Sequence, residues 1–374
     1  MIRTWRDFNF FLLGCVLVLT GFSLALVYSS TNNGVYIGEG TYVYGYFSRH
    51  VANLVVGAVA MVVFTVIDYH MLQAWAWPLY ITALVLLAMV LLRGSVRGGA
   101  QSWLEFGVRS LQPSEIAKLL IVIALAAFWS RNEERAGTWQ SQMGGLILAG
   151  IPLLLVFIQP DFGTAFVMAV VWAAMAWTAG IRVWQIVLLL LFILPIGFLG
   201  WSSVLDDEQK NRLLVFVDPK KYDPTGRGDS WNILKSLEAI GGGGMTGQGW
   251  LGGPFTQSLT LPVAYTDFIF AAAGEELGFV GGSLLILFEC LLLWQGITVA
   301  LTARDSFGRL LAVGITAVFF CHILVNIGMT MSIMPVTGIP LPFVSYGGSF
   351  TLITFAAIGL LQSVALRRRK QTFG

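Results

Sequence analysis

Three carboxylates lie beside a strongly apolar segment, in a position that suggests chemistry. Asp267, Glu275 and Glu276 fall in the stretch LPVAYTDFIFAAAGEELGF, residues 261–279, which runs directly into a segment suited to crossing a membrane. An acidic side chain at the centre of a membrane helix costs roughly 2.5–3.5 kcal/mol. An ionisable group kept in such a place therefore indicates a functional site by default.

Asp267 is the strongest candidate for a general base in this stretch. Like-charged neighbours and partial burial both raise the pKa of a carboxyl group toward the range in which it accepts a proton near neutral pH. Glu275 and Glu276 follow about two helical turns later. The structural alternative is that Asp267 only caps the helix that follows, although Thr266 could cap it equally well.

Other polar residues in the apolar segments have structural explanations as well as functional ones. Lys118 lies one turn into an apolar helix, where its ammonium group either snorkels to the interface or faces a cavity and meets an anion. Asp161, in the short break QPDFGT, is predicted to cap the helix after it. His322 and Asn326 are predicted to form hydrogen bonds between helices, and Glu289 is predicted to be paired inside the bundle.

The composition identifies the class of protein. Of the 374 residues, 56% are hydrophobic and only 11% are charged, whereas a soluble domain has about 25% charged residues. The chain is therefore predicted to be an integral membrane protein, and its net charge of +2 gives no reason to expect a nucleic-acid partner. Cys15, Cys290 and Cys321 all lie in apolar segments, so neither a disulfide framework nor a thiolate metal site is expected.

The apolar windows predict an all-α fold of about ten transmembrane helices in a single polytopic domain, residues 1–374. The predicted helices are residues 10–29, 51–67, 75–92, 116–129, 144–158, 162–179, 184–200, 267–300, 309–334 and 347–366. Arginine and lysine side chains concentrate in the loops on one side, which predicts that both termini are cytoplasmic. Residues 201–262 then form one long extracytoplasmic loop.

Four polar, turn-rich segments are predicted on the outer side, which suggests a cavity open to the outer leaflet. They are residues 93–118, 159–164, 223–267 and 334–349. Within the long loop, residues 231–240 are predicted to form an amphipathic helix on the outer leaflet. The glycine run that follows, residues 241–253, permits close approach of two backbone segments, or else forms a flexible linker.

Four motifs in this order resemble those of the SEDS family (shape, elongation, division and sporulation). The motifs are GAQSWLEFGVRSLQPSEIAK, QPDFGT, LPVAYTDFIFAAAGEELGF and NIGMTMSIMPVTGIPLPFVSYGGS. The resemblance covers nearly the whole chain and is closer to the members that act in cell elongation than to those that act in division. It implies a peptidoglycan glycosyltransferase that polymerises lipid II at the outer face of the bacterial cytoplasmic membrane.

The resemblance also implies roles for individual residues. Asp267 matches the essential aspartate and would take the proton from the acceptor sugar hydroxyl. Cationic side chains would stabilise the leaving pyrophosphate, together with a divalent cation, Mg or Mn. The cations are Arg49, Arg109 and Lys118, and the other implied substrate-binding residues are Gln112, Asp161, Glu275, Glu276 and Ser345.

The chain departs from the family pattern close to this aspartate. Val263 and Tyr265 stand where the family usually has glutamate and histidine, and Gln248 stands where it has lysine. The roles of those three family side chains therefore do not carry over to this chain.

The resemblance implies further a class B penicillin-binding protein as transpeptidase partner, with elongasome scaffold proteins around it. Two other classes of function compete with a polymerase. A lipid flippase or transporter also has broken helices and buried charge, but would need charged groups that continue to the inner side. A non-catalytic scaffold for the transpeptidase would tolerate replacement of Asp267.

Overall fold

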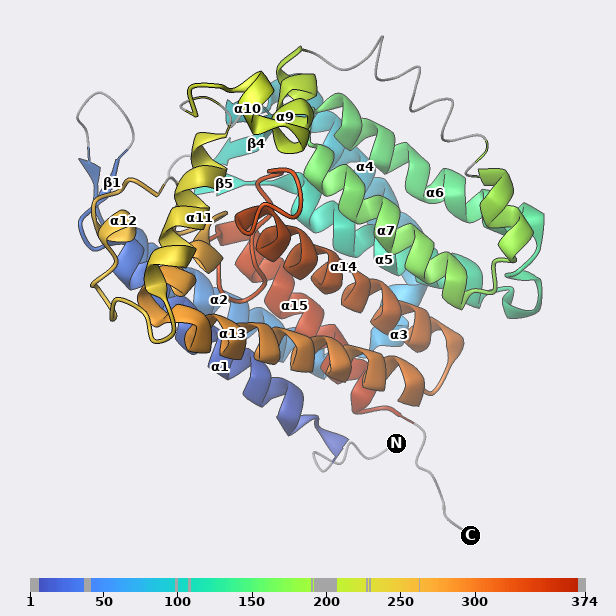
Figure 1. The fold of residues 1–374 in the computed structure, drawn as a ribbon. Coiled ribbons are helices and arrows are strands. Elements are labelled where there is room, and N and C mark those ends of the chain that lie inside the picture. Colours follow the sequence, from blue (N-terminus) through green and yellow to red (C-terminus); the bar gives the residue numbers. More distant parts are fainter. Residues whose placement is uncertain are drawn as a thin grey trace.

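The computed structural model describes residues 7–36, 42–97, 100–106, 109–189, 191, 207–226, 228, 230–261 and 263–368. Figure 1 shows long helices that run side by side, with the labelled strands toward one end. Eight helices in the described part are long and apolar enough to cross a membrane. They are α1 (Phe10–Thr31), α2 (Tyr46–Val66), α4 (Ala76–Arg93), α5 (Pro113–Ser130), α6 (Trp139–Ile158), α13 (Ile269–Thr302), α14 (Ser306–Thr330) and α15 (Gly348–Ala365).

The prediction of an all-α membrane protein is confirmed. The shorter apolar helix α7 (Phe162–Thr178) completes nine of the ten predicted spans. The remaining one, 184–200, lies largely outside the described residues. The short helices are α3 (Tyr69–Ala74), η2 (Glu133–Arg135), α9 (Asp207–Val217), α10 (Pro219–Tyr222), α11 (Trp231–Gly243) and α12 (Pro254–Gln257).

The segment 93–118 is more regular than predicted. It contains a three-stranded antiparallel sheet of β3 (Ser95–Arg97), β4 (Ala100–Phe106) and β5 (Arg109–Leu111), and Leu104 pairs with Leu111. A second, two-stranded sheet joins β1 (Val35–Tyr36) to β2 (Tyr42–Val43). Antiparallel pairing satisfies backbone groups that would otherwise lack partners at the edge of a membrane, which explains why these connections are ordered.

Helices α5, α14 and α15 form the centre of the bundle, since most of their residues are buried. Helix α2 packs closely on α15 through small residues. A side-chain carbon at Gly359 would lie 2.4 Å from the carbonyl oxygen of Met61. The opposite face of α2 carries exposed valines, including Val55, Val59 and Val62, as expected of a surface in contact with lipid.

Helix α13 is kinked at Gly278, and the glycine run packs into the kink. Gly278 has φ of 67° and ψ of −166°, a conformation open only to glycine. The amides of Phe279 and Val280 donate to the carbonyls of Gly244 and Met245 at 2.9 and 3.1 Å. The prediction of close backbone approach is therefore confirmed, and the flexible-linker alternative is wrong.

The predicted helix in the long loop is present as α11. Its buried residues include Ile233, Ser236 and Ala239, and Ser236 Oγ donates to the carbonyl of Thr330 at 2.8 Å. Leu234 and Leu237 remain exposed on the other face. Helix α11 thus joins the bundle through one face and leaves its apolar face outward.

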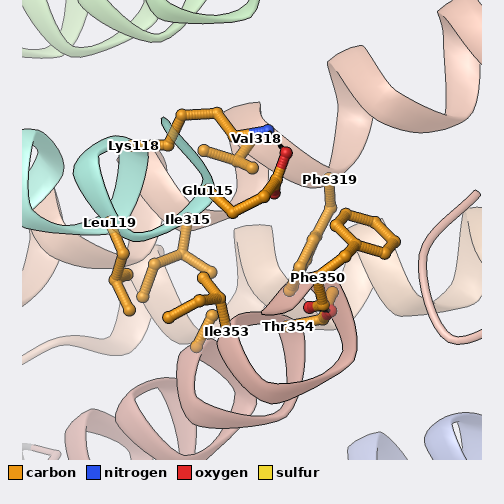
Figure 2. Close-up of a pocket in the computed structure, with 10 residues that line it drawn as sticks. Glu115, Lys118, Leu119, Ile315, Val318, Phe319, Phe350, Ile353 and Thr354 are labelled. Carbon is orange, nitrogen blue, oxygen red and sulfur yellow. Dashed lines mark hydrogen bonds and ion pairs between the residues drawn. The ribbon is translucent and has the colours of Figure 1, made fainter. Parts of the chain in front are cut away.

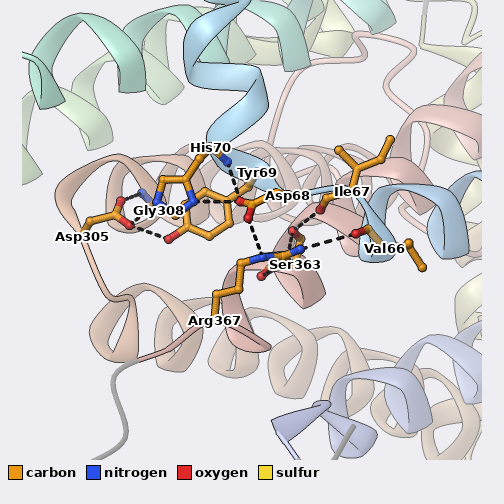
Figure 3. A network of polar contacts seen from close by, with 9 residues as sticks. All are labelled: Val66, Ile67, Asp68, Tyr69, His70, Asp305, Gly308, Ser363 and Arg367. Atoms are coloured by element: carbon orange, nitrogen blue, oxygen red, sulfur yellow. Dashed lines mark hydrogen bonds and ion pairs between the residues drawn. The ribbon is translucent and has the colours of Figure 1, made fainter. Parts of the chain in front are cut away.

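Both described ends of the chain lie at the same end of the bundle, as predicted (Figure 1). The amide of Asn9 donates to Gln362 Oε1 at 3.0 Å, and Arg368 lies 3.7 Å from Asp7. At this end a polar network connects the turn after α2, the turn before α14 and the last turn of α15 (Figure 3). Its charged members are Asp68, His70, Asp305 and Arg367.

Candidate active site

The segment 334–349, here called the proline loop, joins α14 to α15 and organises the site. Its three prolines prevent a continuous helix. Ser345 Oγ donates to the carbonyl of Thr266 at 2.6 Å, and the amide of Tyr346 donates to the carbonyl of Tyr265 at 2.9 Å. The proline loop is thus attached to the segment that carries Asp267.

Asp267 lies just outside the helix that follows it. The N-cap of α13 is Phe268, without a side-chain capping bond, so the capping alternatives for Asp267 and Thr266 are both wrong. Asn326 Nδ2 donates to the carbonyls of Asp267 and Ile339, at 2.9 and 2.8 Å. The predicted hydrogen bond between helices is therefore wrong, since both partners lie in loops and the buried Asn326 Oδ1 has no partner.

The Asp267 side chain is partly buried and lies against the proline loop. A side-chain carbon at Gly338 would lie 3.4 Å from Asp267 Oδ2, so the backbone at this glycine faces the carboxylate. Burial raises the pKa of Asp267 to about 6, although a hydrogen bond from Thr266 acts in the opposite direction. This value suits a general base that works near neutral pH.

A cluster of three tyrosine rings and one arginine lies beside the Asp267 segment. The centroid of the Tyr46 ring is 5.2 Å from that of Tyr265 and 5.4 Å from that of Tyr346. The guanidinium of Arg49 lies 5.8 Å from the centroid of the Tyr46 ring and is exposed to solvent. Arg49 therefore offers a positive charge beside the tyrosine rings. Sequence reasoning missed the ring cluster, because its members are far apart along the chain.

Asp161 and Gln112 meet on another side of the proline loop. Asp161 Oδ1 accepts from the amide of Thr164 at 3.0 Å, which confirms the predicted cap of α7. Gln112 Nε2 donates to Asp161 Oδ2 at 3.4 Å. A side-chain carbon at Gly163 would lie 3.0 Å from the carbonyl of Thr337, so this helix start touches the loop that passes Asp267.

Lys118 is buried below the proline loop, in the interior of the bundle. Its Nζ lies 2.9 Å from Glu115 Oε1 and 2.7 Å from His322 Nε2. Figure 2 shows Lys118 and Glu115 at a small cavity whose other walls are mostly apolar side chains of α14 and α15. Lys118 therefore does not snorkel to the interface, and the cavity that it lines is this small one inside the bundle, where its partner is Glu115. A role for Lys118 in an outer cavity that binds substrate stays a prediction.

Glu275 and Glu276 are buried and bonded within the protein. Glu275 accepts hydrogen bonds from the amides of Phe255 and Thr256 at 2.7 and 2.9 Å, and so holds the start of α12. Glu276 Oε1 accepts from the hydroxyl of Ser29 and from Gln257 Nε2. Glu275 thus holds backbone, whereas Glu276 connects the side chains of Ser29 in α1 and Gln257 in α12.

The other predicted residues are Ser345, Arg109 and Glu289. Ser345 is buried, and its hydroxyl is occupied by Thr266 and by the amide of Leu341. Arg109 lies in β5, and its side chain falls outside the described part. The prediction that Glu289 is paired is wrong, since both of its buried carboxylate oxygens lack a hydrogen-bond partner. The helical pattern places Glu289 inside the bundle but carries no information on a partner.

The described residues do not fit a resident metal ion. No three histidine, cysteine, aspartate or glutamate side chains gather within that part of the chain. Hard divalent cations need several oxygen ligands, so a cage built from these side chains alone is not available there. The requirement for a divalent cation stays a prediction, and no chemical step is derived through one.

The arrangement thus combines a carboxylate of raised pKa, a loop bonded to the backbone of the segment that carries it, and an exposed arginine beside the tyrosine cluster. Such a set can remove a proton from a hydroxyl group while a cation stabilises negative charge on a leaving group.

Comparison with known sequences gives an independent line of argument. The family of FtsW, RodA and SpoVE, described as "Cell cycle protein", matches residues 9–370. The peptidoglycan glycosyltransferase MrdB of Escherichia coli K12 is 35% identical over 358 residues, which cover 95% of this chain and 92% of that protein. Stage V sporulation protein E of Bacillus subtilis 168 is 38% identical over 316 residues, 83% of this chain and 84% of that protein.

Solved structures show the same fold. A chain from a study of how a peptidoglycan synthase complex coordinates polymerization and crosslinking has a TM-score of 0.81 and 27% identity. The similarity covers 97% of this chain and 99% of that one. The rod shape determining protein RodA of Thermus thermophilus has a TM-score of 0.70 and 26% identity, covering 98% and 99% of the two chains.

Proposed function

Since this chain belongs to the FtsW, RodA and SpoVE family, we propose that it is a peptidoglycan glycosyltransferase that polymerises lipid II. The site would lie at the outer face of the bacterial cytoplasmic membrane. The observation that carries the proposal is the Asp267 carboxylate, which combines partial exposure, a raised pKa and a fixed position against Gly338.

Asp267 would accept the proton from the C4 hydroxyl of one sugar as that oxygen attacks the anomeric carbon of a lipid-linked sugar. The bond from the anomeric carbon to the polyprenyl pyrophosphate breaks, with inversion, and the pyrophosphate leaves as an anion. Arg49, exposed beside the tyrosine cluster, would stabilise that charge. Lys118 lies deeper and acts on the site through its contacts with Glu115 and His322.

We propose further that the protein acts in cell elongation and rod shape, with a class B penicillin-binding protein and elongasome scaffold proteins as partners. The name of the relative from Thermus thermophilus, rod shape determining protein RodA, supports this role. The fold similarity to a chain from a peptidoglycan synthase complex supports a partner of this kind. A divalent cation would enter with the pyrophosphate of the substrate, since such ions are commonly bound between carboxylates and substrate phosphates.

The test is polymerisation of labelled lipid II by the purified protein with its transpeptidase partner and Mg²⁺ or Mn²⁺. Asp267→Asn should reduce polymer formation by at least about 100-fold, because an amide does not accept the proton. The matched control is Asp223→Asn, in the exposed part of the long loop, which should leave polymerisation unchanged. Glycan strands of normal length from the Asp267→Asn protein would overturn the assignment. Transport of lipid II across vesicles without polymer would favour a flippase.

A further inference from the structure

His322 is held at both edges and on one face of its ring, deep in α14. The ring is 1% exposed. Its Nδ1 lies 3.0 Å from the carbonyl of Pro340, its Nε2 lies 2.7 Å from Lys118 Nζ, and its face stacks on Phe350 with centroids 5.0 Å apart. Every polar atom of this side chain therefore has a partner.

The partners determine the form of the imidazole. A lysine ammonium only donates hydrogen bonds, so His322 Nε2 must accept from Lys118. A carbonyl only accepts, so His322 Nδ1 must carry the hydrogen that is donated to Pro340. The ring is therefore neutral and in a single tautomer. It transmits a hydrogen-bond chain from Glu115 through Lys118 to the proline loop.

The far end of this chain lies next to the reacting carboxylate. Pro340 is two residues from Gly338, whose backbone faces Asp267 Oδ2, and five residues from Ser345, which bonds to Thr266. The proline loop is thus bonded to His322 through the carbonyl of Pro340 and to the Asp267 segment through Ser345. Loss of the His322 ring leaves the carbonyl of Pro340 and one donor of Lys118 without their partner.

We propose that His322 is a positioning residue for the polymerase reaction. Its neutral ring connects the buried Lys118–Glu115 pair to the proline loop and so fixes the Asp267 carboxylate in its reactive position. The inference rests on the proposed function. Because small displacements of reacting groups cost as much as about 100-fold in rate, a loosened loop should lower kcat more than it raises KM.

The experiment compares two variants of the full-length protein with its partner. His322→Phe keeps an aromatic ring for Phe350 but removes both nitrogens, and should lower kcat for lipid II polymerisation by about 10- to 100-fold with little change in KM. His322→Gln offers one acceptor and one donor and should restore kcat to within about fivefold of the wild type. If His322→Phe does not fold, His322→Met replaces it.

A double-mutant cycle with Lys118→Met separates positioning through Lys118 from a purely local effect. The double variant should be no slower than Lys118→Met alone, because the second change removes a contact already lost. Unchanged kcat in His322→Phe, no rescue by His322→Gln, or fully additive losses would each overturn the inference. These outcomes presuppose polymer from the wild type, whereas its absence would contradict the proposed function itself.

Discussion

At the scale of single residues, the pKa of Asp267 determines how activity should depend on pH. A general base works only when it is deprotonated, so kcat/KM should fall as the pH drops through about 6, the pKa of this carboxyl, and level off above it. Initial rates of lipid II polymerisation between pH 5 and 8 measure this dependence of kcat/KM on pH. A rate that stays constant down to pH 5 would show that Asp267 is not the base.

The same raised pKa affects stability with a defined sign. Burial raises the pKa of Asp267 from 3.8 to about 6, so the folded state binds this proton more tightly than the unfolded state. The contribution of the Asp267 carboxyl to the free energy of unfolding is fully present below about pH 4. This contribution is lost as the pH rises through about 6. Asp267→Asn should therefore raise the free energy of unfolding at pH 8 by roughly 1–3 kcal/mol and have little effect at low pH.

Asp223 supplies a control of opposite sign for that measurement. Hydrogen bonds from Ser230, Thr225 and the Gly228 amide outweigh burial and lower the pKa of Asp223 to about 2. Asp223→Asn should therefore destabilise the protein at pH 8, and the loss should shrink as the pH falls toward 2. Thermal melting in detergent at several pH values checks both variants. Shifts of the same sign for the two would contradict the argument.

Sequence reasoning succeeded at residues whose role is local or follows from residue type. The Asp161 cap depends on the next three residues, so it was predictable. For Asn326 the burial was predictable, but its loop carbonyl partners were not. The partners of Glu275 and Glu276 lie 19 or more residues away along the chain, so no local pattern reveals them. For Glu289, burial was predictable and the missing partner was not.

At the scale of elements, the kink in α13 depends on glycine for two reasons. Gly278 has a positive φ, and a side-chain carbon there would lie 2.2 Å from the amide nitrogen of Gly247. Gly278→Ala should thus lower the free energy of unfolding by about 3 kcal/mol and loosen the packing of the glycine run, lowering polymerase activity as well. Chemical denaturation and polymer yield measure the two effects.

Gly282→Ala, one turn further along the same helix, is the matched control. The nearest atom to a side-chain carbon there is Phe270 Cζ at 3.8 Å, an ordinary contact. Because alanine favours the helix by about 1 kcal/mol over glycine, this variant should be neutral or slightly more stable. Equal losses in the two variants would show that the kink does not require glycine.

The helices were predictable because twenty apolar residues suffice to define a membrane span. Boundaries shifted by a few residues, and the start of α2 at Tyr46 places Arg49 and His50 inside the helix. The strands β3, β4 and β5 were missed, since their polar segments lack the alternation that marks a strand. The convergence of the proline loop on Asp267 is a tertiary property that no local pattern contains.

At the scale of the whole molecule, the network in Figure 3 holds together three connections at the end opposite the proposed active site. Arg367 Nε lies 3.1 Å from Asp68 Oδ2, and its other nitrogens donate to Ser363 and to the carbonyl of Val66. Asp305 accepts from Tyr69 and lies 2.9 Å from His70 Nε2. The ends of α2 and α15 are therefore connected to each other and to the turn between α13 and α14.

Two adjacent arginines allow a matched test of this network. Arg367 has a side chain that is 12% exposed, whereas Arg368 is 46% exposed and has a single long contact, 3.7 Å, to Asp7. Arg367→Met should lower the free energy of unfolding by about 1–2 kcal/mol, because it breaks several charge-assisted hydrogen bonds. Arg368→Met should cost less than about 0.5 kcal/mol, as exposed ion pairs usually do.

The effect of Arg367→Met should also depend on pH in a defined direction. Burial raises the pKa of Asp68, but hydrogen bonds from His70 and the charge of Arg367 outweigh it, so the net pKa lies below the ordinary 3.8. The contribution of the Asp68 carboxylate to the free energy of unfolding is present above pH 3.8 and is lost as the pH falls through the folded pKa. The free energies of unfolding of the wild type and of Arg367→Met should therefore converge at acidic pH. Polymerase activity should not change, because α15, with 18 residues, keeps the network roughly 25 Å from the proline loop. Melting curves from pH 3 to 8, with polymer yield at pH 7.5, test this, and a large loss of activity in a stably folded Arg367→Met protein would show that the two ends are coupled.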